Sequence, residues 1–438
     1  MSLVLPFDII SLIIDIVGED NDKDLLKELA LVSHSFLQIS SKHLFATIEL
    51  HDACPKYHVA SSKKGFVRLL NSRPNVINYI RKLTYKTDDR AYKTEDNDCY
   101  PPPSFDNEDD LLSPILLNFL PTTSRLNCLK IDALNVHAGS RSDWNLLNPS
   151  LTSAFLHLMH LPTINHIDLS YICNFSWFSL TSSVNLHRLD ILHLKHSHPQ
   201  GGDSSYEIVL SEMMPKIREF HTSESSAQTK MLLHAKRQDG RPAFNFMDLR
   251  QVSMPFGWPG DERNIQYLLQ NAKLLEKLHL SVEIDQKLVG LHVILSPIPR
   301  TLKVLDLDLS VDLHYGSIPL RLAVLCEELE AMAGHNMLPV EALSFDVHVG
   351  PVGHEAEVFI GSMIQEVEKV LIKSGWSALR QVSFEFSIAC WGEAIRENLA
   401  KLPEALEFLS DKYPNLSKLE FISIDSSPYV VKCKFEFD

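Results

Sequence analysis

Apolar residues recur along most of the chain in a six-residue pattern, in which the first, fourth and sixth positions are apolar. Alternation over its last three positions is typical of a short strand with one buried face. The pattern therefore predicts a series of short strands between residues 80 and 421. Its copies span residues 80–85, 126–131, 164–169 and 186–191, later copies begin at Leu249, Leu275, Leu302, Val340, Leu379 and Leu416, and a degenerate copy begins at Ile217.

Segments with helical spacing separate these strands. In the last segment Leu399, Leu402, Leu406 and Leu409 form an amphipathic stripe. A proline often stands just ahead of the next strand, where it ends the helix and favours extended backbone; these are Pro162, Pro215, Pro299, Pro339 and Pro414. Helices are expected at residues 110–120, 150–160, 261–271, 320–333, 355–373 and 393–412. The alternation of strand and helix predicts an α/β fold.

The first fifty residues have a different pattern, which predicts three short helices. The first would begin at Pro6, because a proline in the first turn loses no intrahelical hydrogen bond. Its apolar residues form two stripes, Ile9, Ile13 and Ile16 on one side and Ile10, Ile14 and Val17 on the other. One stripe can pack within the segment, and the other then requires a partner. Asp22 or Asp24 is expected to cap the second helix.

These helices carry a set of residues with a recognisable spacing: Leu5, Pro6, Asp8, Ile9, Ile13, Leu26, Leu29, Val32 and Phe36. In this pattern the segment resembles the F-box, the three-helix module that joins receptor subunits to the small adaptor of cullin–RING ubiquitin ligases. Residues 31–36 and 43–48 are similar, more narrowly, to the F-box-like families of mushroom-forming fungi. The resemblance implies that these nine residues bind the adaptor. The alternative is that residues 5–45 only cap a larger domain, as repeat proteins require.

Helix, proline and strand then repeat through the rest of the chain. This layout resembles an irregular leucine-rich-repeat solenoid of the ribonuclease-inhibitor-like type. The resemblance implies an F-box at residues 1–50 and a target-binding solenoid at residues 51–438. An acidic, proline-containing stretch at about 87–110 is expected to be a loose insertion, and residues 196–205 a loop. An ordinary doubly wound α/β domain is the alternative, because its strands and helices alternate in the same way.

In such a strand the residue between the last two apolar positions points away from the buried face. This column is polar throughout and tends to be acidic: Lys130, Asp168, Asp190, His221, Ser253, His279, Asp306, Ser344, Ser383 and Glu420. Asp308, Asp346 and Glu385 follow on the same face two residues later. We expect Asp168, Asp190, His279 and Asp306 to contact a target protein that is basic at the contact. A solvated sheet face explains the same polarity without any target.

Composition narrows the classes of partner and compartment. The net charge of −15 argues against a general nucleic-acid binder, and no apolar run approaches the ~18–20 residues that span a membrane. The N-terminal segment lacks the features of a signal peptide. The seven cysteines are scattered without C-x-x-C spacing, which indicates reduced thiols in the cytoplasm or the nucleus.

The sequence carries few signs of catalytic chemistry. The sequence has no phosphate-binding glycine motif and no nucleophile elbow. His193, His196 and His198 are the nearest approach to a metal site, but they lack a carboxylate at ligand spacing, and we interpret them as polar residues at a repeat edge. The resemblance to the F-box implies a receptor subunit of an SCF-type ligase, and the lack of catalytic motifs fits a subunit with no catalytic residue, metal or cofactor. The alternatives are a leucine-rich scaffold outside ubiquitination and, third, an enzyme with an unrecognised site.

Overall fold

The structure is a computed structural model that describes residues 7–20, 22–51, 62–86, 112–119, 125–133, 142–194, 214–237, 239–257, 260–283, 290–311, 318–334, 339–349, 356–373, 376–388, 416–422 and 429–436. Contacts divide the chain into two compact units. The first comprises Met1–Lys216 and Ala235–Phe244, and the second Ile217–His234 and Asn245–Asp438. The expected insertion at 87–110, the loop at 196–205 and the helix at 393–412 lie outside the described residues.

Three helices open the first unit: α1 (Phe7–Glu19), α2 (Lys23–Val32) and α3 (His34–Leu44). Asp22 caps α2 as predicted, accepting a hydrogen bond from the Leu25 N–H at 3.0 Å. The helices share a core of their own, in which Ile14, Leu26 and Ile39 are buried and Ile10, Val17, Leu29, Phe36 and Leu44 pack against them. Each helix thus turns one apolar face toward the other two.

The sheet of the first unit consists of parallel strands that lie in chain order, β1 (Thr47–His51), β2 (Lys82–Lys86), β3 (Cys128–Asp132), β5 (His166–Ser170) and β7 (Arg188–Leu192). Between them lie α4 (Ser62–Ser72), η2 (Pro74–Tyr79), η4 (Ile115–Phe119), η5 (Trp144–Leu146), α7 (Pro149–Met159) and η6 (Trp177–Leu180). A small parallel pair is formed by β4 (Ser142–Asp143) and β6 (Ile172–Cys173). Because β1 begins at Thr47, the sheet starts before the boundary predicted at residue 50.

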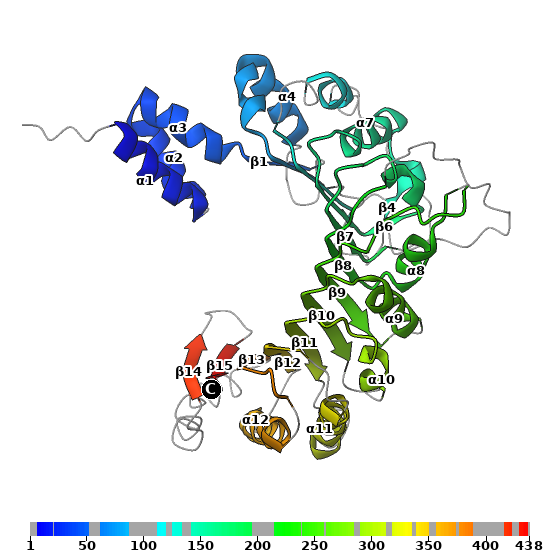
Figure 1. Cartoon of the computed structure of the whole chain (residues 1–438). Coiled ribbons are helices and arrows are strands. Elements are labelled where there is room, and N and C mark those ends of the chain that lie inside the picture. The colour runs from blue at the N-terminus through cyan, green and yellow to red at the C-terminus, as the bar shows by residue number, and fades with distance from the viewer. Residues whose placement is uncertain are drawn as a thin grey trace, which may run out of the picture. The chain divides into compact units, whose positions relative to one another are not determined.

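The second unit continues the same construction (Figure 1). Its parallel strands, again in chain order, are β8 (Glu219–Ser223), β9 (Gln251–Phe256), β10 (Lys277–Glu283), β11 (Val304–Val311), β12 (Ala342–Val349) and β13 (Gln381–Ile388). Its helices are α8 (Ser226–His234), α9 (Asp261–Asn271), α10 (Leu291–Leu295), α11 (Ile318–Gly334) and α12 (Ala356–Lys373). The order then changes, because β15 (Tyr429–Glu436) pairs antiparallel with β13 and β14 (Leu416–Ile422) pairs antiparallel with β15.

One backbone contact recurs at the start of nearly every strand and makes the copies structurally equivalent. The carbonyl at the second position of a copy accepts hydrogen bonds from two successive N–H groups at the start of the next strand; Arg81 O, for example, accepts from Asn127 N at 2.8 Å and Cys128 N at 3.1 Å. The same acceptor position is filled in the first unit by Ala46, Arg81, Asn127 and Asn165, and in the second by Arg218, Arg250, Glu276, Lys303 and Glu341. We call this series the carbonyl ladder.

Burial alternates along the strands of the second unit, so the sheet there has two unlike faces. In β11 the side chains of Leu305, Leu307 and Leu309 are buried, whereas Asp306 and Asp308 between them are partly exposed. The helices α9 to α12 lie along one face of the strands of the second unit (Figure 1). A doubly wound sheet would be covered on both faces and would lack this alternation. The predicted α/β class is confirmed, with a large parallel sheet.

Candidate functional site

The first candidate surface lies on α1 and α2. Ile9, Leu12, Ile13 and Ile16 follow one another at helical spacing on α1, and all four are exposed, Ile13 by 45%. Val32, on α2, is 64% exposed. We call the exposed apolar side chains of these two helices the helical surface: Phe7, Ile9, Leu12, Ile13, Ile16, Leu25, Leu31 and Val32. The two predicted stripes of α1 are confirmed, since Ile10, Ile14 and Val17 face the core instead.

The residues predicted to bind the adaptor differ in their exposure. Asp8, Ile9, Ile13 and Val32 are exposed. Leu29 and Phe36 are half-buried against the core of the three helices. Leu5 and Pro6 lie outside the described residues.

The prediction that Leu26 lies on the adaptor-binding surface is wrong. Its side chain is only 1% exposed, in the core with Ile14 and Ile39, so it belongs to the interior and not to the surface of the module. The spacing that assigned it to a binding face also fits a core position. Leu12, Ile16, Leu25 and Leu31 are exposed apolar residues that the family pattern did not single out. Leu12 and Ile16 lie three and seven residues after Ile9, so helical spacing alone already places them on the same face of α1.

Three polar side chains, one on α1 and two on α3, link these two helices. Asp15 Oδ1 lies 2.6 Å from Lys42 Nζ and 2.7 Å from His43 Nε2. Hydrogen bonds from Lys42 and His43 lower the pKa of the Asp15 carboxyl below its ordinary value. The ring of His43 packs against Gly18, where an added Cβ would come within 2.2 Å of the imidazole. A glycine at this position therefore allows the close approach of the two helices.

The second candidate surface is the exposed face of the sheet, where the pairing register aligns the predicted polar column. In the first unit Lys130 pairs with Asp168, and Asp168 with Asp190. In the second unit His221, Ser253, His279, Asp306, Ser344 and Ser383 form one continuous row. Glu420 does not extend this row directly, because β15 lies between β13 and β14.

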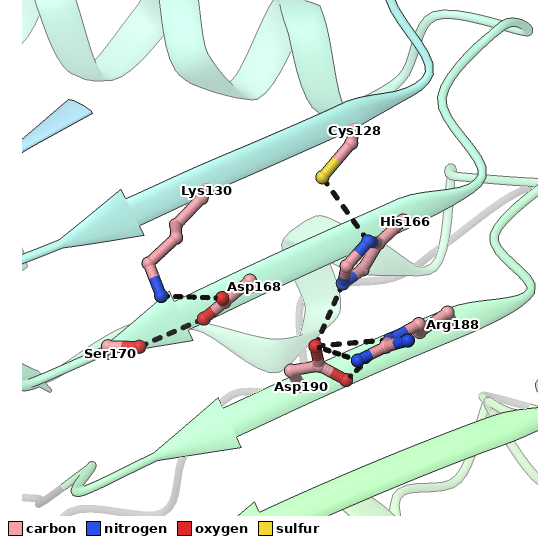
Figure 2. A network of polar contacts seen from close by, with 7 residues as sticks. All are labelled: Cys128, Lys130, His166, Asp168, Ser170, Arg188 and Asp190. Carbon is pink, nitrogen blue, oxygen red and sulfur yellow. Dashed lines mark hydrogen bonds and ion pairs between the residues drawn. The ribbon is translucent and has the colours of Figure 1, made fainter. Parts of the chain in front are cut away.

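Side chains of β3, β5 and β7 form a network on this face (Figure 2). Asp168 accepts hydrogen bonds from Lys130 Nζ at 2.8 Å and Ser170 Oγ at 2.9 Å. Asp190 Oδ2 accepts from His166 Nε2 at 2.8 Å and from Arg188 Nη2 at 3.1 Å. His166 Nδ1 lies 3.2 Å from Cys128 Sγ. We call these seven residues the strand-face network: Cys128, Lys130, His166, Asp168, Ser170, Arg188 and Asp190.

The network changes the role assigned to Asp168 and Asp190, which were predicted to contact a target. Asp168 and Asp190 are almost fully buried, and both carboxylates already bind cations of the same chain. Their charges therefore stabilise the face itself, and contact with a basic target stays a prediction. Sequence reasoning missed Cys128, His166 and Arg188. All three stand at the third position of consecutive copies, so aligning that position as well as the fifth would have placed them side by side.

The network holds His166 in its protonated form. Burial lowers the pKa of His166, but hydrogen bonds with Asp190 and Cys128 oppose this effect and raise it to about 9. Burial likewise lowers the pKa of Lys130, and the hydrogen bond and charge of Asp168 raise it above its ordinary value. At neutral pH the face therefore carries an imidazolium, an ammonium and a guanidinium against two carboxylates.

The raised pKa of His166 makes the free energy of unfolding decrease as the pH rises. A group whose pKa is raised by folding contributes stability that is complete below its ordinary pKa of 6.5 and is lost as the pH rises through about 9. We expect the urea midpoint of the protein to fall between pH 6.5 and 9.5, by an amount equivalent to at most about 3 kcal/mol. The His166→Gln variant provides the control, since its midpoint should change less over this range. Parallel curves for the two proteins would contradict the assignment.

The equivalent face of the second unit is more acidic. Asp306 Oδ2 binds Lys277 Nζ at 2.7 Å. Asp308 lies 3.4 Å from His348 Nε2 and 4.0 Å from His279 Nε2. Register places Asp308, Asp346 and Glu385 next to one another on three strands. Burial raises the pKa of Asp346, and the charges of Asp308 and Glu385 raise it further against the opposing charge of His348.

Within the described part of the chain, no three His, Cys, Asp or Glu side chains converge where a metal ion could bind. Of the three histidines considered above, only His193 is described; it stacks on Tyr171 with 4.4 Å between ring centroids. The helices that the structure describes include none with the length and apolar character needed to cross a membrane. No protein-family model matches the chain, and neither does any curated protein.

Proposed function

We propose that this protein is the substrate-recognition subunit of an SCF-type cullin–RING ubiquitin ligase, with an F-box in its N-terminal helices. The observation that carries the proposal is the helical surface. The three helices form their core from other residues, and Ile9, Leu12, Ile13 and Ile16 remain exposed outside it. A cluster of exposed aliphatic side chains on a small module is typical of a protein-binding site. An adaptor that covers this stripe would remove it from water.

The rest of the chain would then be an irregular leucine-rich-repeat solenoid. Strands that follow one another in chain order, a carbonyl ladder that repeats with each copy and helices along one face support this assignment. In solenoids of this type each repeat contacts its neighbours and leaves an extended strand face open for a partner. We propose that this face binds the target, and that Asp308, Asp346 and Glu385 favour a target segment that is basic.

A receptor of this kind promotes ubiquitin transfer by holding the target in place. Holding a target close to the charged ubiquitin carrier raises its effective concentration at the transferring subunit, so no catalytic group is required in the receptor itself. The strand-face network is consistent with this role, because its charges are paired and hold neighbouring strands together.

Affinity purification of the full chain followed by mass spectrometry tests the proposal. We expect the small adaptor and a cullin among the captured proteins, and both should be lost when residues 1–46 are removed. Other captured proteins should remain, because the sheet would still be present. Capture of partners by the full chain without any adaptor or cullin would contradict the ligase role and favour the alternative, a leucine-rich scaffold outside ubiquitination.

A further inference from the structure

Three side chains of the strand-face network form a line that resembles an activated nucleophile. Cys128 Sγ lies 3.2 Å from His166 Nδ1, and the opposite ring nitrogen lies 2.8 Å from Asp190 Oδ2 (Figure 2). A thiol, an imidazole and an orienting carboxylate in this order are the parts by which proteins activate cysteine. Each comes from a different strand, β3, β5 and β7, so the sheet itself sets their spacing.

The imidazole is fixed at both ends. Asp190 is held in turn by Arg188, whose Nε donates to Oδ1 at 3.1 Å and whose Nη2 donates to Oδ2 at 3.1 Å. The carboxylate cannot rotate away from His166 without breaking these bonds. Asp190 therefore directs the second N–H of the ring toward the sulfur. His166 acts as a positioning and proton-carrying group, and Cys128 is the atom that would react.

We propose that Cys128 is a modification site at which small hydroperoxides oxidise the thiol to a sulfenic acid. The thiol loses its proton to water, the imidazolium of His166 stabilises the resulting thiolate, and the sulfur attacks the terminal oxygen of the peroxide. An S–O bond forms, the O–O bond breaks, and the departing hydroxide or alkoxide takes the proton from His166. The sulfur is oxidised by two electrons, and the hydroperoxide is reduced to water or an alcohol.

The same chain contains a cysteine in the opposite environment. Burial and the neighbouring charges of Glu366 and Glu330 raise the pKa of Cys326 to about 11, which disfavours its thiolate. Cys128 has a cationic ring at hydrogen-bond distance instead. Its residue is 7% exposed, and this limits the reagent to small molecules such as hydrogen peroxide. Cys326 therefore serves as an internal reference for reactivity.

The test uses the full chain and hydrogen peroxide, with a dimedone-type trap for sulfenic acid and peptide mass spectrometry. We expect Cys128 in the native protein to be trapped about tenfold faster than Cys326, and faster than Cys128 in the urea-unfolded chain. A cysteine that is only buried would react more slowly when native. Native trapping that is equal to or slower than trapping in urea would overturn the proposal, and this comparison requires no variant.

Variants then identify the contribution of the imidazole. His166→Gln should reduce the native rate at Cys128 about tenfold and leave Cys326 unchanged. Ser170→Ala is the matched control, because the hydroxyl of Ser170 belongs to the network but donates to Asp168, away from Cys128 and His166. A folded His166→Gln protein in which Cys128 reacts at the original rate would also overturn the proposal.

Discussion

Replacing Ile9 and Ile13 together by aspartate should abolish the co-purification of adaptor and cullin. Both side chains belong to the exposed stripe of α1, and neither contributes to the core of the three helices. The few hot-spot residues near the centre of an interface contribute about 2 kcal/mol or more each, and we expect Ile9 and Ile13 to be among them. Loss of two such residues would weaken binding about a thousandfold, and the two new charges would remain unpaired at the contact.

The structure also supplies the controls for this experiment. Met247→Asp and Val293→Asp alter apolar side chains in the second unit that are also exposed, at 54% each. These variants should retain the adaptor. Circular dichroism should show an unchanged helix content for the Ile9/Ile13 variant, whereas Leu26→Asp would unfold the module and would not be informative. Adaptor bound to the Ile9/Ile13 variant at the original level would exclude docking through this surface.

Asp190→Ala should destabilise the protein by about 3–5 kcal/mol, because it removes the carboxylate that binds both His166 and Arg188 and takes the opposing charge away from a half-buried imidazolium. The measurement is the urea midpoint at pH 7. The outcome decides between two roles for Asp190, since a residue reserved for target binding would cost little stability when replaced.

Asp306→Ala is the matched comparison. Asp306 occupies the same column position in β11, but it binds Lys277, whose side chain is 42% exposed and can be solvated when released. Its replacement should cost less than about 1 kcal/mol. Combining Asp190→Ala with His166→Gln should cost less than the sum of the single changes, because the unpaired imidazolium is then absent. Additive effects would mean that the two residues do not interact.

The strands could be predicted because their signal is local. Each copy carries its buried residues within six positions, and every predicted strand is present among the described residues. The helix at Asp261–Asn271 has the predicted bounds, since an acidic first turn and the buried apolar residues Ile265, Leu268 and Leu269 define it. By contrast, α10 has five residues and α8 mixes polar and apolar residues around its circumference, so neither has a clear helical period.

One strand was missed for a different reason. Phe45, Ile48 and Leu50 form a further copy of the six-residue pattern, and β1 pairs with β2 in the same register as the later strands. On the sequence alone, these residues fall at the end of the F-box predicted for residues 1–50. Pairing between side chains on different strands was also beyond prediction, because His166 and Asp190 meet only once the register is fixed. The resemblance to a family could locate a surface on α1. Only the burial of Leu26 in the structure shows that this residue does not belong to that surface.

The carbonyl ladder has a consequence for how this chain can change in length. A single acceptor near the start of each copy fixes the next strand, and the connecting segment takes no part in that contact. Connectors of different length therefore lead to the same alignment, as between β3 and β5 and between β5 and β7. Sequence can be added to or removed from a connector while the strand that follows keeps its position. A protein built in this way offers natural points for grafting peptides or whole domains without redesigning the sheet.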